Sequence, residues 1–221
     1  MQILELQLFS TDLDAQETVY GDRLGFMIER SKDQLKVFCG ENILIFKEGP
    51  QQFYYHYCFL IPTGSLESAI EFLNDKRFEA VPYNEERIIH FDNGKSVYFY
   101  DGNGNIAEFI ERPLTNYPQK NSFEISDVIK LNEIGIPVSN PLDTSEHLMS
   151  KYGIVPLTHV AFRDDFCWVG DHHGVFLICK IGRNWMPTQK PAESNDLSVL
   201  FSEGNEKKGL MCKAGELIRT I

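Results

Sequence analysis

The feature that most constrains this chain is an internal repeat of one strand, one helix and three strands. Residues 3–9 alternate between apolar and polar side chains, and residues 13–24 have helical spacing before a glycine. Residues 54–61 and 66–76 repeat this order, and each helix is followed by three short strand patterns. Residues 1–112 therefore contain two copies of a βαβββ unit, and such a repeat indicates a fold built from similar units.

The second half of the chain contains a third copy and a reduced fourth copy. The third comprises a strand at 128–138, a helix at 142–152 and strands near 155–162, 166–169 and 175–180. The fourth has a strand at 197–201 and two more within 210–221, with no helix between them. We therefore predict an α+β fold of cupped mixed sheets, in two similar domains of which the second is incomplete. The domains are expected at 1–112 and 121–221, joined by a linker at 113–120.

Acidic residues outnumber basic residues, and this limits the partners that the surface attracts. The chain has 32 Asp and Glu against 21 Lys and Arg, which gives a net charge of −11 at pH 7. Such a surface repels phosphate backbones and anionic lipid headgroups. No apolar run approaches the roughly 18 residues that a transmembrane helix needs. We therefore expect a small-molecule substrate as the partner, and neither nucleic acid nor membrane.

Five widely spaced cysteines predict free thiols. They are Cys39, Cys58, Cys167, Cys179 and Cys212. Their number is odd and no Cys-x-x-Cys pair occurs, so the pattern does not indicate a disulfide framework. Such a chain is typical of a reducing compartment, and we expect a cytoplasmic protein.

Two segments carry a resemblance to a known family. Residues 97–111 read VYFYDGNGNIAEFIE, and the opening of the chain reads LQLFSTDLDA with RLGF at 23–26. These segments resemble the vicinal oxygen chelate superfamily, which includes glyoxalase I, extradiol dioxygenases, fosfomycin-resistance proteins and bleomycin-binding proteins. Gly102 stands where the family usually has proline. The resemblance covers 1–112 well and 127–181 less closely, and it implies the paired βαβββ units that the repeat also predicts.

The resemblance implies a divalent metal ion in the cup between two units, held by the first and last strands. At the matching positions this chain has Glu5, His56 and Glu108, whereas Ile45 at the fourth position cannot ligate. Glu5 lies on the strand face opposite the leucines, and Glu108 lies among apolar residues. A carboxylate on such a strand has to be solvated, paired or ligating, because burying it alone is costly.

The expected ligand set favours some metals and reactions over others. Non-haem iron oxygenases use two histidines and one carboxylate, whereas Glu5, His56 and Glu108 supply one histidine and two carboxylates. Oxygen-rich ligation favours Mn²⁺ or Mg²⁺ and also permits Zn²⁺ or Ni²⁺, while Fe²⁺ with oxygen activation fits less well. The set fits Lewis-acid chemistry on two adjacent substrate oxygens.

The third unit has its own candidates at the matching positions. Glu133 corresponds to the first-strand ligand, Asp196 lies on the partner strand, and Arg219 falls where the last glutamate belongs. The alternatives are a second metal site or a plain ion pair between Glu133 and Arg219, and the cation favours the ion pair.

Further residues are candidates for contact with the substrate. Glu108, Tyr98 and His90 are the candidates for moving a proton, because they lie on strands near the expected cup. Tyr100, Arg183 and Trp185 are candidates for binding the substrate, the last two from a loop that would cover the cup. The alternative for each is an ordinary packing role.

Three functions fit this sequence. The first is a metal-dependent enzyme of lyase or isomerase type that acts on a small substrate with vicinal oxygens. The second is a metal-free protein that binds or sequesters a small molecule, as bleomycin-resistance proteins do. The third is an extradiol-type ring-cleavage dioxygenase, which the multi-unit length favours and Glu5 disfavours. A sheet edge left by the incomplete fourth unit would also favour a homodimer.

Overall fold

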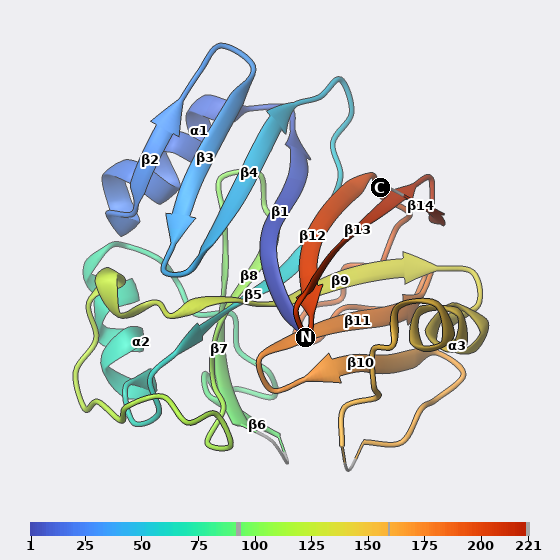
Figure 1. Cartoon of the computed structure of the whole chain (residues 1–221). Helices are drawn as coiled ribbons and strands as arrows, with labels where there is room; N and C mark the ends of the chain where they lie inside the picture. The colour runs from blue at the N-terminus through green and yellow to red at the C-terminus, as the bar shows by residue number, and fades with distance from the viewer. Residues whose placement is uncertain (92–93, 159, 220–221) are drawn as a thin grey trace.

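A computed structural model describes residues 1–91, 94–158 and 160–219, with the side chain of the last residue left out. These residues form two mixed seven-stranded sheets, with the helices packed on them (Figure 1). Sheet A has the order β14-β13-β12-β1-β4-β3-β2, and sheet B has the order β10-β11-β9-β5-β8-β7-β6. The fold is therefore α+β, as the repeat predicts.

Sheet A combines the first unit with the fourth. Its strands are β1 (Gln2–Ser10), β2 (Met27–Arg30), β3 (Gln34–Cys39), β4 (Asn42–Glu48), β12 (Leu197–Glu203), β13 (Glu206–Lys213) and β14 (Glu216–Arg219). The two units meet where β1 pairs antiparallel with β12. The fourth unit is a meander of three antiparallel strands, and β13 begins before the predicted segment 210–221.

Sheet B combines the second unit with the third. Its strands are β5 (His56–Ile61), β6 (Ile89–Phe91), β7 (Gly94–Tyr100), β8 (Ile106–Glu111), β9 (Lys130–Val138), β10 (Phe166–Asp171) and β11 (Gly174–Lys180). The units meet where β5 pairs antiparallel with β9. Residues 113–120, expected to join two domains, thus connect β8 to β9 within one sheet.

The helices pack against the same core as the two sheets. They are α1 (Leu13–Glu17), continued by the π-helical η1 (Thr18–Leu24), α2 (Leu66–Asp75), the short η2 (Ile125–Asp127) and α3 (Pro141–Tyr152). Among the helices of the described residues, none is long and apolar enough to cross a membrane.

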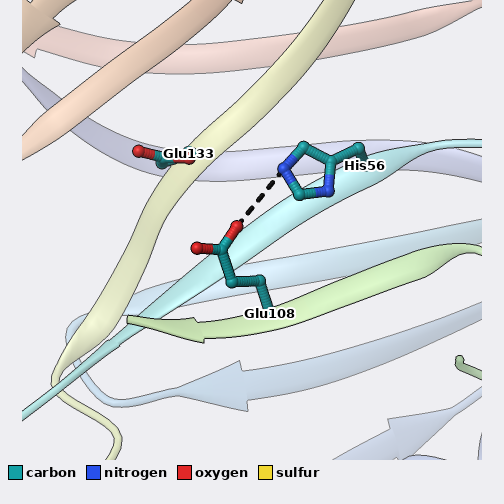
Figure 2. A group of neighbouring side chains, drawn as sticks. All are labelled: His56, Glu108 and Glu133. Carbon is teal, nitrogen blue, oxygen red and sulfur yellow. Dashed lines mark ion pairs between the residues drawn. The ribbon is translucent and has the colours of Figure 1, made fainter. Parts of the chain in front are cut away.

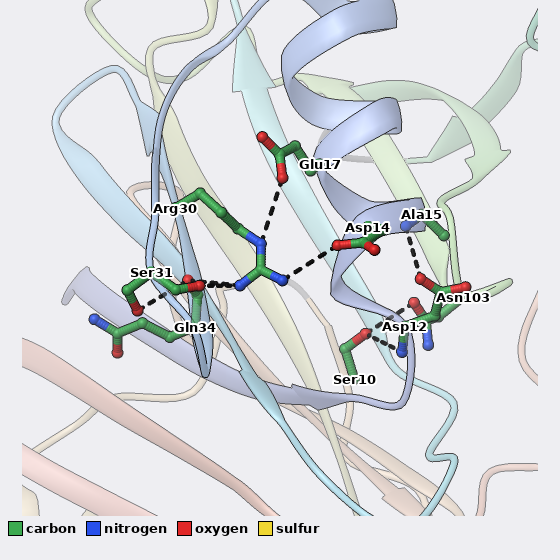
Figure 3. Close-up of polar contacts among 9 residues, drawn as sticks. All are labelled: Ser10, Asp12, Asp14, Ala15, Glu17, Arg30, Ser31, Gln34 and Asn103. Carbon is green, nitrogen blue, oxygen red and sulfur yellow. Dashed lines mark hydrogen bonds and ion pairs between the residues drawn. The ribbon is translucent and has the colours of Figure 1, made fainter.

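The start of α1 is fastened to the β2–β3 hairpin by polar contacts (Figure 3). The Asp12 carboxylate accepts a hydrogen bond from the Ala15 backbone N–H at 2.8 Å, as an N-cap residue does. The Arg30 guanidinium lies 3.3 Å from the Asp14 carboxylate and 3.4 Å from that of Glu17. These pairs hold the first helix against the edge of sheet A.

The segment that carries the family resemblance has a structural role at the junction of two units. One Asp101 carboxylate oxygen accepts the backbone N–H groups of Asn103 and Asn105, both at 2.9 Å. The other accepts hydrogen bonds from the Gln16 amide at 2.8 Å and the Tyr57 hydroxyl at 2.5 Å. A Cβ at Gly102 would lie 2.5 Å from a backbone oxygen of α1, so only glycine fits there.

One predicted strand of the third unit is absent. Among the described residues of 155–162, no strand forms; isolated backbone contacts reach β10, such as Leu157 N–H to Trp168 O at 3.0 Å. Pro156 forms an isolated bridge with Val169 of β10, and among the described residues this pairing does not continue as a ladder. The segment instead contributes Leu157 and Val160 to the wall of a cavity.

The main hydrophobic core lies between the two sheets. Alternate residues of sheet A, such as Leu6 and Phe46, contribute to the same buried cluster as Phe59, Phe109 and Phe176 of sheet B. A second cluster, which includes Leu177 and Trp185, lies on the opposite face of sheet B. Sheet B is therefore covered on both faces, and the second face forms the cup described next.

Candidate metal centre

A cavity of about 370 Å³ opens on the face of sheet B that points away from the main core. Strands β5 to β11 supply its floor. One wall comes from Leu157, Val160 and Arg163, and the cover comes from Arg183, Trp185 and Met186. Most of its lining is aromatic or aliphatic, with a few charged side chains at the floor and the mouth. This composition is typical of a small-molecule site.

Three potential metal ligands meet at the floor of this cavity (Figure 2). His56, Glu108 and Glu133 are buried, and one ligating atom from each lies within 4.8 Å of the others. His56 Nε2 lies 3.3 Å from Glu108 Oε2. The three side chains come from three different strands, β5, β8 and β9, which are neighbours in sheet B.

Strand register brings these side chains together. Cys58 on β5 lies opposite Glu108 on the parallel strand β8 and opposite Glu133 on the antiparallel strand β9. His56 is two residues from Cys58, so alternation places it on the same face of β5. A shift of one residue in either pairing would move a carboxylate to the other face of the sheet.

Polar neighbours orient both carboxylates. The Ser96 hydroxyl on β7 donates a hydrogen bond to Glu108 Oε1, and Arg112 forms an ion pair with Glu133 Oε1. Arg112 is held in turn by a hydrogen bond of 2.7 Å from its Nε to Asn132 Oδ1. His56 Nδ1 and Glu108 Oε2 have no hydrogen-bond partner among the described residues, although both are buried.

Burial and neighbouring charges shift the pKa values of Glu133 and Tyr98, which line the cavity. Desolvation raises the pKa of Glu133 to about 6, against the charge of Arg112 and with the help of Glu108. Desolvation also raises the pKa of Tyr98 far above its usual value, and the Glu108 and Glu133 charges add to this shift. Tyr98 therefore keeps its proton at neutral pH and can act as a hydrogen-bond donor but not as a base.

The residues at the floor fit a divalent metal ion. They offer one imidazole nitrogen and two carboxylates, and the unpartnered Glu108 Oε2, which faces His56 Nε2, is a buried polar atom that ligation would satisfy. Arg112 leaves one Glu133 oxygen for a ligand, and such outer contacts commonly orient ligating carboxylates. Leu177, on the last strand of the third unit, lines the cavity but cannot ligate.

Glu5 does not belong to this group, contrary to what the resemblance implies. It lies on β1 in sheet A, where it pairs with Leu200 on β12 and Ile43 on β4. The expectation required β1 and β5 to face a common cup, but β5 takes β9 as its neighbour. Glu133, which occupies the matching position of the third unit, therefore lies where Glu5 was expected.

The structure does not bring together the residues that were candidates for a second metal site in the third unit. Asp196 accepts a hydrogen bond from the Ala214 backbone N–H at 2.9 Å, within the part of the chain that forms sheet A. Arg219 lies at the end of β14 in sheet A, and its side chain is outside the described residues. The cation paired with Glu133 is Arg112 rather than the expected Arg219.

The other predicted site residues divide into two groups. Tyr98, Arg183 and Trp185 line the cavity, and the Tyr98 and Trp185 rings lie 5.9 and 5.2 Å from the His56 ring. His90 is exposed and lines a neighbouring hollow instead. Tyr100 is 38% exposed and lies under the Lys190 ammonium, outside the cavity lining. His90 pairs with Lys95 and so lies on the face opposite Ser96 and Tyr98, whereas Tyr100 lies on the cup face but at the end of β7.

Two contributors to the floor were missed by the sequence analysis. Ser96 precedes Tyr98 by two residues on β7, and Arg112 follows Ile110 by two residues at the end of β8. The same alternation that places Tyr98 and Glu108 on the cup face also places these two there. The signal was therefore present, but an arginine just beyond a strand is usually assigned to solvent.

Solved structures with a similar fold were compared over nearly the whole chain. A protein from Bacillus subtilis, provisionally described as a dioxygenase, aligns with a TM-score of 0.61 and 15% identity, covering 91% of this chain and 81% of its own. A glyoxalase I variant from Zea mays aligns with a TM-score of 0.56 and 13% identity, covering 96% and 92%. This chain has the vicinal oxygen chelate fold.

Comparisons of the sequence itself found no relative of this chain. No family model matches the chain, and no curated protein matches it. A lactoylglutathione lyase from Agrobacterium tumefaciens is 22% identical, with a TM-score of 0.45 over 52% of this chain and 96% of its own. The two alignments over nearly the whole chain, at 15% and 13% identity, establish the fold alone, and the function has to be argued from the site.

Proposed function

We propose that this protein is a divalent-metal-dependent enzyme of lyase or isomerase type that acts on a small substrate with two adjacent oxygen atoms. The observation that carries the proposal is the meeting of His56, Glu108 and Glu133 at the floor of a lined cavity. Three convergent ligands beside open cavity space are typical of a catalytic metal site rather than a structural one.

The donor set supports some metals more than others. Two carboxylates and one imidazole suit Mn²⁺, Zn²⁺ or Ni²⁺, with Mg²⁺ less favoured because of the nitrogen ligand. A bound ion would supply Lewis-acid polarisation of the two substrate oxygens. The departure from two histidines and one carboxylate disfavours iron-dependent ring cleavage.

The protein's own residues have separable tasks in this proposal. Arg112 holds Glu133 in place, and Ser96 fixes one oxygen of Glu108 while the other faces His56. Glu108 is the candidate for moving a substrate proton, and Tyr98 donates a hydrogen bond to negative charge on a substrate oxygen. Trp185 covers His56 and excludes water from the floor.

Metal titration by calorimetry tests the ligand assignment. We expect Mn²⁺, Zn²⁺ or Ni²⁺ to bind the native protein at one site, and Glu108→Gln and Glu133→Gln to weaken binding by about a hundredfold or more. Glu5→Gln is the matched control and should bind as the native protein does. Absence of binding to the native protein, or weakening by Glu5→Gln alone, would overturn the proposal.

One observation favours a second function, that of a metal-free small-molecule binding protein. Arg112 already forms an ion pair with Glu133, and Ser96 already donates a hydrogen bond to Glu108, so each carboxylate has a protein partner without an ion. Under this alternative the native protein binds no metal, whereas apolar ligands still enter the cavity. Iron binding with oxygen consumption on a catechol would instead support the dioxygenase.

A further inference from the structure

Two arginines face the cavity at the end remote from the candidate metal ligands. Arg163 lies on the segment before β10, and Arg183 follows β11. Both contact the same carboxylate: Arg163 Nε lies 3.0 Å from Asp165 Oδ1, and Arg183 Nε lies 3.1 Å from Asp165 Oδ2. Together they form an arginine pair at the mouth of the cavity.

The arginine pair has one positive charge in excess. Asp165 offers one carboxylate to two guanidinium groups, and the pair lines the cavity of a chain whose net charge is −11. Burial raises the pKa of Asp165, but hydrogen bonds and charge from Arg163 and Arg183 outweigh it and lower the pKa below its usual value. Asp165 therefore remains ionised at neutral pH, and the excess charge at the mouth is a single one.

Arg183 is held in a fixed orientation. Its guanidinium lies 4.4 Å from the centre of the Phe166 ring and donates a hydrogen bond of 3.0 Å to the Asn184 carbonyl. A guanidinium fixed in this way presents its remaining N–H groups as a planar fork. That geometry matches a carboxylate and loses little entropy when it binds one.

Between the arginine pair and the floor, the cavity wall is aromatic. Phe166, Trp168 and Trp185 contribute to it. Trp185 lies directly on β9, where a Cβ at Gly135 would be only 2.5 Å from the indole ring. The buried Trp185 indole N–H has no hydrogen-bond partner among the described residues. Such a wall favours a flat apolar body with a polar substituent.

Strand register gives the length of a ligand that would reach both ends. Glu133 pairs with Val175 on β11, and Phe166 pairs with Cys179 on the same strand. The four steps from Val175 to Cys179 span roughly 13 Å at 3.3 Å per residue. Arg163 and Arg183 line the cavity, so the length that a ligand has to span is shorter than this. The volume of about 370 Å³ lies near the lower limit for ligand sites, so it suits a molecule of one ring.

We propose that the substrate is a single-ring aromatic carboxylate, with its carboxylate at Arg163 and Arg183 and two adjacent oxygens at His56, Glu108 and Glu133. The proposal rests on the proposed function for the role of the floor. The arginine pair, the aromatic wall and the floor then each recognise one part of the molecule.

Binding without metal tests the carboxylate separately from the metal site. Both tryptophans of the chain line the cavity, so their fluorescence reports its occupation, and calorimetry provides a second measurement. The probes are 3,4-dihydroxyphenylacetate and 4-methylcatechol, which share the ring and the vicinal oxygens and differ in the carboxylate. In the presence of a chelator we expect the acid to bind about tenfold more tightly than the neutral probe.

Variants locate the source of that preference. Arg163→Gln and Arg183→Gln should each reduce it, and together they should remove it while the affinity for 4-methylcatechol changes by less than about twofold. Arg30→Gln, on the edge of sheet A, is the matched control and should keep the preference. Equal affinity for the two probes, no binding of the acid at millimolar concentration, or a preference that survives both substitutions would overturn the inference. Since no metal is present, these failures are distinct from failure of the metal titration.

Discussion

The two sheets have the same plan, and they differ in what covers their second face. In each sheet the first strands of two units pair antiparallel at the centre, β1 with β12 and β5 with β9. Both sheets bury one face in the shared core. In sheet B, β5, β8 and β9 are buried on both faces, whereas the strands of sheet A alternate between buried and more exposed residues.

The side chains at the centre of the two sheets also differ in chemistry. Sheet B has His56, Glu108 and Glu133 at the floor of its cavity. The central strands of sheet A place Glu5 among Leu200 and Ile43, with Ile45 two residues along from Ile43. One scaffold thus supports a buried polar site only where loops cover it and where neighbouring side chains pair with each carboxylate. Three predictions can break or sharpen this comparison, and they are ordered by expected effect.

The largest effect is expected from removing the cation at the floor of sheet B. Arg112→Met leaves Glu133 as a buried and unpaired carboxylate, so we expect a loss of about 3–5 kcal/mol in the free energy of unfolding. Arg30→Met removes an ion pair with Asp14, which is exposed, and should cost less than about 1 kcal/mol. Urea denaturation measures both. Adding Glu133→Gln to Arg112→Met should recover part of the loss, and equal costs for the two single variants would contradict the difference between the sheets.

A smaller effect is expected from disturbing the cover of sheet B. In Gly135→Ala the new methyl group would overlap the Trp185 indole, so the loop has to shift, and we expect about 1–3 kcal/mol of destabilisation. The tryptophan emission should move to longer wavelength because water reaches the cavity. Unchanged emission and stability would show that Trp185 does not seal the floor.

The smallest effect is expected in the pH dependence of metal binding. The pKa of Glu133 is raised from 4.5 to about 6, so the group is protonated in the folded protein at pH values where it would ordinarily be ionised. A ligating carboxylate has to lose its proton, so affinity should be nearly constant above pH 7 and fall by up to about tenfold per unit below pH 6. Calorimetric titrations from pH 7.5 to 5 measure this. Glu5→Gln should show the same profile, and an affinity that stays constant down to pH 5 would contradict a ligand role for Glu133.

Much of this architecture follows from local patterns. Alternation predicts the strands and the faces on which His56 and Glu108 lie, and turn and capping residues separate the units. The segment from Asp101 to Asn105 marks the end of the second unit, where its polar groups satisfy one another. Arg183 and Trp185 were also expected in a loop over the cup, and the structure places both in the cavity lining.

The ligand set was beyond the reach of those patterns. Glu5 and Glu133 occupy matching positions of two units, and nothing local distinguishes them. Which of them joins His56 depends on whether β5 pairs with β1 or with β9, and the structure pairs it with β9. Tyr100 shows a similar limit, because alternation gives the face of a strand but not how far the cup extends along it. His90 was misplaced for a different reason, because its pairing with Lys95 puts it on the face opposite Ser96 and Tyr98.

The sequence by itself determined the repeating units, the α+β class and the face on which each strand residue lies, because these depend on contacts between near neighbours in the chain. Only the tertiary structure decided that the second unit pairs with the third and the first with the fourth. The edges of β1, β5, β9 and β12 all offer similar backbone hydrogen bonds, so the choice among them depends on the packing of the whole molecule. That choice brings Glu133 and Arg112 to His56 and Glu108, and leaves Glu5 on the other sheet.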